Sequence, residues 1–286
     1  MKVRTILLGL FLTVFFLPPP SFAADLGVGL TSYYSWWNPP FEKTLGVDEI
    51  GPSLLVGPAL SLRVFKKVSL GAYMMIGTSK DEFTAKYEGY HAPSGNYYRT
   101  EQKREFKNRA DGGFTLAYII NQYLNVFAGY KFASYSLYKK NGRISLNNGP
   151  YADYQSKYKD ETGNSIVGYA LGVNVSLPAT EALTVILGLS GVYQPEQNYR
   201  WDLTTGPLNP DGNYGESTIR GKYSGKGFNA TATGAYYFSS IKTVLTLGGR
   251  YQYIKYKAID EDTLKIDSES HYGITFSAMY YFTFFE

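Results

Sequence analysis

The chain has 286 residues, no cysteine, 30 glycines and 28 tyrosines, and 17% of its residues are aromatic. Without cysteine, disulfide-stabilised scaffolds and sites that need a thiol nucleophile or thiolate ligands are excluded. The formal net charge of +4 is too small for a nucleic-acid-binding protein that depends on gross positive charge.

The first predicted element is a secretory signal peptide over residues 1–23. Two cations precede an almost unbroken apolar run, and Ser21 and Ala23 place small residues where a signal peptidase cleaves. Cleavage removes two of the 28 Lys and Arg residues and none of the 24 Asp and Glu residues, which lowers the net charge from +4 to +2. We therefore expect an exported protein with one mature domain, residues 24–286.

The mature chain is built from segments in which bulky apolar residues alternate with small or weakly polar ones. A period of two places one set on each face of a β-sheet. Charges lie mostly between the segments, unlike in a soluble sandwich, and no mature segment has the roughly 18 consecutive apolar residues of a membrane-spanning helix. The pattern predicts ten strands, at 26–37, 53–65, 68–80, 111–121, 124–138, 164–177, 183–194, 226–238, 242–257 and 270–285.

The predicted connections alternate between short and long. The short ones are 66–67, 122–123, 178–182 and 239–241, and the long, polar ones are 38–52, 81–110, 139–163, 195–225 and 258–269. This alternation is typical of an all-β, transmembrane, up-and-down antiparallel β-barrel with short periplasmic turns, long extracellular loops and both termini in the periplasm. Strand-like alternation inside 81–110, on both sides of a turn at residues 93–96, leaves twelve strands as the alternative to ten.

Aromatic residues gather near the predicted strand ends, where a bilayer interface favours them. Tyr33, Tyr34, Trp36 and Trp37 fall at the outer end of the first strand. The last strand, from residue 270, is amphipathic and ends in aromatic residues followed by Glu286. In these features the chain resembles Gram-negative outer-membrane β-barrel proteins, and the resemblance covers the whole mature chain. It implies an outer-membrane location, in contact with outer-membrane lipid and lipopolysaccharide, but names no closer family.

Such barrels include enzymes, and the two histidines are the candidate catalytic groups of this chain. His91 falls at a predicted loop tip, and His271 opens the last strand beside Glu269 and Ser270. Omptin surface proteases, which are similar ten-stranded barrels, carry paired rim aspartates in a context that this sequence does not match. Ser270 and His271 are adjacent in one strand and point to opposite faces. We therefore expect solvated or interfacial histidines and no enzyme.

No metal or cofactor site is expected. Residues 211–216 offer alternating oxygen ligands, but they lack the full calcium-loop pattern and follow a strong turn sequence. The basic residues of 81–110 are interpreted as a solvated charged loop, with contact to lipopolysaccharide phosphates as the alternative; they are Lys103, Arg104, Lys107 and Arg109.

The charges predicted to face the lumen suggest a function. If bulky apolar residues face lipid, then Arg63, Lys131 and Arg250 point inward, with Arg63 near the periplasmic mouth and the other two at mid-barrel height. No Asp or Glu is expected at the central inward positions. Because an unpaired cation is costly in a dry interior, we expect either water in the lumen or loop carboxylates folded inward. The first case predicts a narrow, porin-like channel for small, anionic solutes.

The second case predicts a non-conducting surface barrel whose loops bind an extracellular ligand or another partner. The aromatic residues suspected of such binding are Tyr97, Tyr98, Tyr199, Trp201 and Tyr214, because aromatic side chains are frequent binding anchors. A hydrolase centred on His271 is the third alternative. Ten strands do not decide between a pore and a filled barrel, since about eight strands are filled by side chains and sixteen leave a channel.

Overall fold

A computed structural model describes residues 25–40, 50–78, 82–91, 96–147, 152–155, 161–208, 214–259 and 266–283. The predicted signal peptide, residues 211–213 of the segment 211–216 and the terminal residues 284–286 lie outside these ranges, and residues 214–216 begin β10. The strands are β1 (Asp25–Asn38), β2 (Ile50–Phe65), β3 (Val68–Thr78), β4 (Glu82–His91), β5 (Asn96–Asn121), β6 (Leu124–Leu146), β7 (Ala152–Gln155), β8 (Glu161–Pro178), β9 (Leu183–Leu208), β10 (Tyr214–Phe238), β11 (Thr243–Ala258) and β12 (Ser268–Thr283), with a 3-10 turn η1 (Ser239–Ile241).

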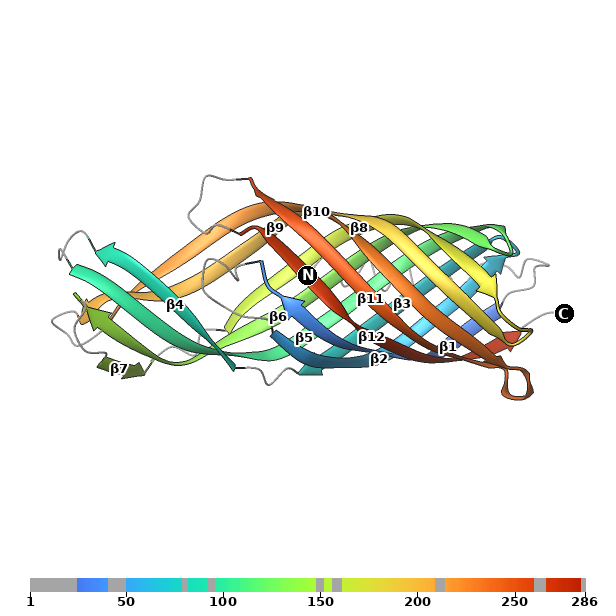
Figure 1. The fold of residues 1–286 in the computed structure, drawn as a ribbon, viewed down its shortest axis with the longest axis horizontal. Coiled ribbons are helices and arrows are strands. Elements are labelled where there is room, and N and C mark those ends of the chain that lie inside the picture. The colour runs from blue at the N-terminus through green and yellow to red at the C-terminus, as the bar shows by residue number, and fades with distance from the viewer. Residues whose placement is uncertain are drawn as a thin grey trace, which may run out of the picture.

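Ten of these strands form a closed antiparallel barrel (Figure 1). Consecutive strands of the ring pair with each other around the wall, including β5 with β6. β1 pairs with β12 along fourteen residue positions, which closes the ring. Short connections at 66–67, 122–123, 179–182 and 239–242 join strands at one end, here called the turn end. The predicted ten-stranded up-and-down barrel is confirmed, and the twelve-strand alternative is wrong because β4 and β7 lie outside the ring.

The opposite end of the barrel is drawn out into long hairpins and is here called the hairpin end. β5, β6, β9 and β10 have 23 to 26 residues each and continue past the ring (Figure 1). β4 pairs with the extended part of β5, as the alternation inside 81–110 suggested. The prediction of a loop over 195–225 is wrong, since β9 and β10 stay paired there.

The outer wall of the ring is apolar, as predicted. Leu171 is 72% exposed and Leu247 62%, and further bulky apolar residues on every ring strand are exposed in the same way. Tyr34 and Tyr236 are among the exposed aromatic residues near the two edges of this apolar belt. Within the described ranges, no helix is long and apolar enough to cross a membrane.

The seam between β1 and β12 requires glycine, because the two backbones approach closely. A Cβ at Gly29 would lie 1.9 Å from the carbonyl oxygen of Ala278, and one at Gly273 would lie 2.1 Å from that of Tyr34. Any side chain at these positions forces the strands apart. Glycine at both positions is thus part of how the barrel closes.

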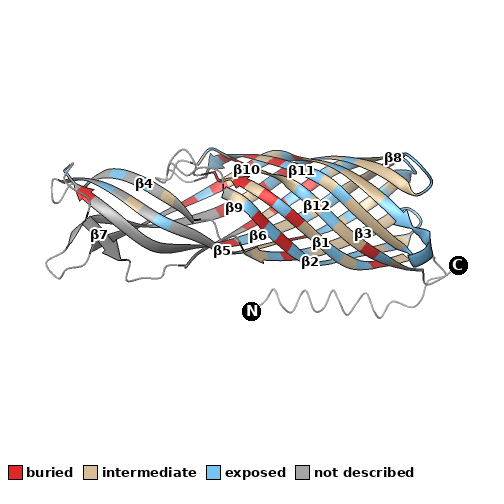
Figure 2. Cartoon of the chain, turned by 60° about the horizontal axis from the view of Figure 1, so that its bottom comes forward, coloured by how far each residue is buried: buried red, intermediate tan, exposed pale blue. Residues whose placement is uncertain are grey.

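The inner face differs between the two ends. Small or weakly polar side chains line much of the turn-end half, among them Ala59, Ser61, Gly71, Thr115 and Ser277. Met279 and Tyr281 also point inward there. Most fully buried residues gather in the half nearer the hairpins (Figure 2). Tyr33, Leu55 and Met75 pack there with Tyr73 on the β1–β3 side of the lumen. Tyr33 and Trp37, expected at the bilayer interface, instead point inward, because they alternate with the outward Tyr34 and Trp36.

Candidate functional site: a charged cavity inside the barrel

A cavity of about 70 Å³ lies inside the hairpin-end half of the barrel. Its walls include apolar side chains such as Phe132, Ile166 and Val192. Six residues with acidic or basic side chains also line it; they are Arg109, Asp111, Lys131, Arg250, Glu269 and His271. Charge is thus concentrated where a soluble protein would place a hydrophobic core.

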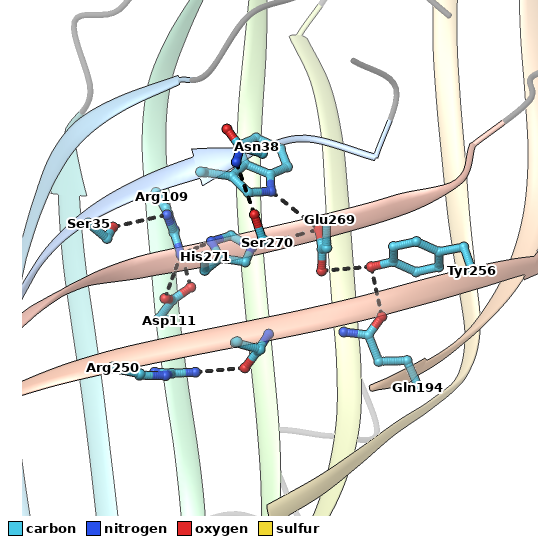
Figure 3. A network of polar contacts seen from close by, with 12 residues as sticks. Ser35, Asn38, Arg109, Asp111, Gln194, Arg250, Tyr256, Glu269, Ser270 and His271 are labelled. Atoms are coloured by element: carbon cyan, nitrogen blue, oxygen red, sulfur yellow. Dashed lines mark hydrogen bonds and ion pairs between the residues drawn. The ribbon is translucent and has the colours of Figure 1, made fainter. Parts of the chain in front are cut away.

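Arg109 neutralises Asp111 and links three strands. Both residues lie on β5, two positions apart and on the inner face, and Asp111 is only 8% exposed. Arg109 Nη2 lies 3.0 Å from Asp111 Oδ2, and Nε lies 3.4 Å from Oδ1. The guanidinium also reaches Ser35 Oγ on β1 and His271 Nδ1 on β12, each at 3.4 Å (Figure 3). It therefore spans the lumen between strands that are not neighbours in the ring.

Glu269 is held by donors from three directions. The Tyr256 hydroxyl donates to Oε1 at 2.7 Å and also lies 2.9 Å from the Gln194 side-chain amide (Figure 3). Trp37 Nε1 donates to Oε2 at 3.3 Å, and His271 Nε2 lies 3.7 Å from the same oxygen. The ring of Trp37 stacks on that of His271, with 5.5 Å between centroids and 7° between planes. The carboxylate is 2% exposed, and this set of donors offsets its loss of hydration.

Lys131 and Arg250 differ from Arg109 in having no carboxylate partner among the described residues. Arg250 donates from Nε to Asn229 Oδ1 at 2.9 Å and from Nη2 to Gln252 Oε1 at 2.8 Å. Its guanidinium lies 5.3 Å from the centroid of the Tyr33 ring, a cation–π distance. These neighbours are all neutral, so the positive charge of Arg250 is not balanced by direct contact.

The expectation that no carboxylate faces the central lumen is wrong. Asp111 and Glu269 both point inward, from strands rather than from inserted loops. The alternation of faces along a strand indicates the inward direction of both residues. Asp111 lies four positions from the inward Thr115, and Glu269 lies four positions from the inward Gly273. Arg63 lies at the turn end as expected, half exposed and 3.9 Å from Asp25, and is not part of the cavity.

Two further residues lie elsewhere than the sequence indicated. His271 was expected to be solvated or interfacial, but its side chain is only 12% exposed because Trp37 covers its ring. Arg109 was assigned to an exposed loop, but it lies on β5 and points into the cavity. Lys103 is exposed on the hairpin, and the side chains of Arg104 and Lys107 lie outside the described set.

The five aromatic residues suspected of partner binding all lie on strands of the extended hairpins rather than in loops. Tyr97 is 39% exposed, and its hydroxyl donates to Glu88 Oε2 at 2.8 Å. That hydrogen bond to a carboxylate raises the pKa of Tyr97. The side chains of the other four lie outside the described set. Within the described part of the chain, no three His, Asp or Glu residues are grouped closely enough to hold a metal ion.

Comparison with known proteins finds solved structures with a similar architecture. No protein-family model and no curated protein sequence matches the chain. Among solved structures, the outer membrane protease OmpT from Escherichia coli is similar, with 12% identity and a TM-score of 0.51 over 93% of this chain and 99% of the protease. The chain has the fold of an outer-membrane β-barrel. At this identity the likeness shows the fold alone.

Two channels of Pseudomonas putida are also similar in part. One is an outer membrane channel from strain F1, with 8% identity and a TM-score of 0.36 over 93% of this chain and all of the channel. The other is the toluene transporter TodX, with 12% identity and a TM-score of 0.29 over 96% of this chain and 92% of the transporter.

The expectation that the chain is not an enzyme is overturned by the likeness to the protease, because a barrel of this fold serves catalysis there. That expectation rested on a solvated rim histidine without an organised carboxylate. In the structure, His271 lies inside the barrel beside Glu269, and Arg109 connects it to Asp111.

Proposed function

We propose that the protein is a narrow outer-membrane channel that passes small solutes and prefers anions. The observation that carries this proposal is the pair Lys131 and Arg250, which line the cavity without a carboxylate partner in the described part of the chain. Asp111 and Glu269 are already engaged by their own donors, so the uncompensated charge in the cavity is positive. In a narrow water-filled passage, such charges attract anions and repel cations.

The proposed route follows the axis of the barrel. From the cavity it continues through the turn-end half, and the cluster of Tyr33, Leu55 and Met75 narrows the lumen from the β1–β3 side. Gly168 on β8 also lines the cavity, from another part of the ring. In this proposal the hairpin end is extracellular, and the turn end with both chain termini is periplasmic, as in other barrels with short and long connections.

Replacing both Lys131 and Arg250 with glutamate is expected to reverse the ion preference. The double variant exchanges two cations for two anions at the narrow part of the lumen, so the sign of the reversal potential in a salt gradient should change. The measurement is single-channel recording in planar bilayers with potassium chloride at different concentrations on the two sides.

Arg63→Glu is the control for this experiment. Arg63 lies at the turn end, half exposed and near Asp25, so solvent screens its charge and the reversal potential should change little. An unchanged reversal potential in the double variant contradicts the assignment of Lys131 and Arg250. A wild-type barrel without discrete conductance contradicts the channel itself, and favours a surface barrel whose hairpins bind partners.

Hydrolysis inside the cavity is a second candidate function, favoured by the contact between Glu269 and His271. An imidazole oriented by a carboxylate on one nitrogen is able to accept a proton on the other. In the structure, Arg109 Nη2 lies 3.4 Å from that second nitrogen, Nδ1. Arg109 therefore has to move away before Nδ1 accepts a proton.

For this candidate, His271→Ala should lower hydrolysis of a small chromogenic ester, 4-nitrophenyl acetate, by about 10²- to 10⁴-fold. Ser270→Ala is the matched control, because Ser270 is adjacent but bonds Asn38 outside the cavity lining. Equal activity in His271→Ala and the wild type dismisses the hydrolase.

A further inference from the structure

We propose that the cavity contains a discrete site for one small oxoanion, of the phosphate, sulfate or short-carboxylate class, bound by the Tyr33 hydroxyl, Lys131 and Arg250. The inference deepens the proposed function by naming the class of anion. It rests on that function only for the anion's passage, because a bound anion does not require a conducting barrel.

The Tyr33 hydroxyl is the first observation that points to a ligand. Tyr33 is 1% exposed and lines the cavity, yet its hydroxyl has no hydrogen-bond partner among the described residues. Buried hydroxyls in folded proteins nearly always have a partner in protein or water, and leaving one without a partner costs about 1–3 kcal/mol. An acceptor that enters the cavity removes this cost.

The charges around Tyr33 show that the acceptor is an anion. The guanidinium of Arg250 lies 5.3 Å from the Tyr33 ring centroid, and Lys131 and Asp111 line the same cavity. The two oxygens of Asp111 are already bound by Arg109. Two cations that line the same cavity repel each other, and an anion bound between them replaces that repulsion by attraction.

The donor set and the size of the cavity select an oxoanion. A guanidinium has five N–H donors, of which the bonds to Asn229 and Gln252 use two, so Arg250 retains donors for a ligand. Several oxygen acceptors on one centre match such a fork, whereas a halide does not. The cavity of about 70 Å³ has room for roughly five water molecules at 10–15 Å³ each, which a small oxoanion displaces.

The walls of the cavity keep lipid and large ligands out. The site is enclosed by the barrel, so phospholipid and lipopolysaccharide phosphates on the outer wall do not reach it. Phe132, Ile166 and Val192 form an apolar side of the cavity, against which a bulky polar solute loses its hydration without compensation. Free anions of a few atoms are therefore the class that fits.

The test is isothermal titration of the folded barrel in detergent micelles with inorganic phosphate, sulfate and acetate, and with chloride for comparison. We expect saturable one-to-one binding of the oxoanions, tighter than any binding of chloride. Tyr33→Phe removes the hydroxyl but keeps the ring beside Arg250, so oxoanion affinity should fall about tenfold or more, as for a lost hydrogen bond to a charged group. Lys131→Met should weaken binding at least as much.

Two controls separate this site from general electrostatics. Tyr34→Phe changes the neighbouring tyrosine on the lipid-facing side of β1, and Arg63→Met removes a cation remote from the cavity; both should bind as the wild type does. Absence of saturable binding, or equal affinities in Tyr33→Phe and the wild type, overturns the site. Saturable binding in a barrel that does not conduct supports the site and rejects the channel, whereas conduction without saturable binding does the reverse.

Discussion

Replacing Arg109 with methionine is expected to lower the free energy of unfolding by about 3–5 kcal/mol, the cost of leaving a buried carboxylate without its partner. Asp111 would lose both contacts to the guanidinium while its side chain stays 12% exposed. His271 and Ser35 would each lose a contact at the same time. The measurement is urea unfolding of the barrel in lipid vesicles, followed by tryptophan fluorescence.

The double variant Arg109→Met, Asp111→Asn is the matched control for this prediction. It removes the buried charge together with its partner, and replacing both members of a buried pair is often close to neutral. Most of the lost stability should therefore return. If Arg109→Met alone unfolds at the same urea concentration as the wild type, the ion pair does not contribute to stability in the way the geometry indicates.

Replacing Gly29 with valine is expected to prevent closure of most molecules. Its Cβ would lie 1.9 Å from the Ala278 carbonyl oxygen and 2.8 Å from the Met279 Cα, and these are backbone atoms that cannot turn away as a side chain can. Overpacking at a rigid contact costs about 1–3 kcal/mol or more. Here it also parts the pair of strands that closes the ring. The folded fraction is read from the shift in gel mobility between heated and unheated samples.

Gly249→Ala is the control for the seam. Gly249 is a glycine of β11, and a Cβ there meets nothing within 4 Å. The folded fraction of this variant should match the wild type. Equal folding of Gly29→Val and Gly249→Ala would show that the seam tolerates side chains, and that its glycines have another role.

The ring itself was predictable because its residues face two different media. Lipid outside and a polar lumen inside impose an alternation that is visible in each strand, for example from Val167 to Val175, and the short turns fix the pairing of consecutive strands. The hairpins were not predictable in the same way. In residues 195–208, Pro195, Gly206 and Pro207 stand among many polar residues, which is the composition of a loop, although β9 and β10 stay paired there.

The cavity was only partly predictable for a similar reason. Parity places Lys131, Arg250 and Asp111 on the inner face, but it does not show which of them meet across the lumen. Arg109 and His271 are 162 residues apart and lie on strands that are not neighbours in the ring. Their contact depends on the diameter and stagger of the whole barrel, which no local pattern contains. The stacking of Trp37 on His271 is of the same kind.

The bridging position of Arg109 has a consequence for how the barrel forms. In an open sheet, β5 and β12 are distant, so Arg109, Glu269 and His271 lack the partners they have across the lumen. The favourable energy of these contacts is released only when the ends of the sheet meet. We therefore expect closure to occur in one cooperative step, with partly curled sheets poorly populated because they lack the contacts of Arg109 with His271 and of Trp37 with Glu269. The polar network is thus expected to favour closure of the ring during assembly, in addition to lining the cavity of the finished barrel.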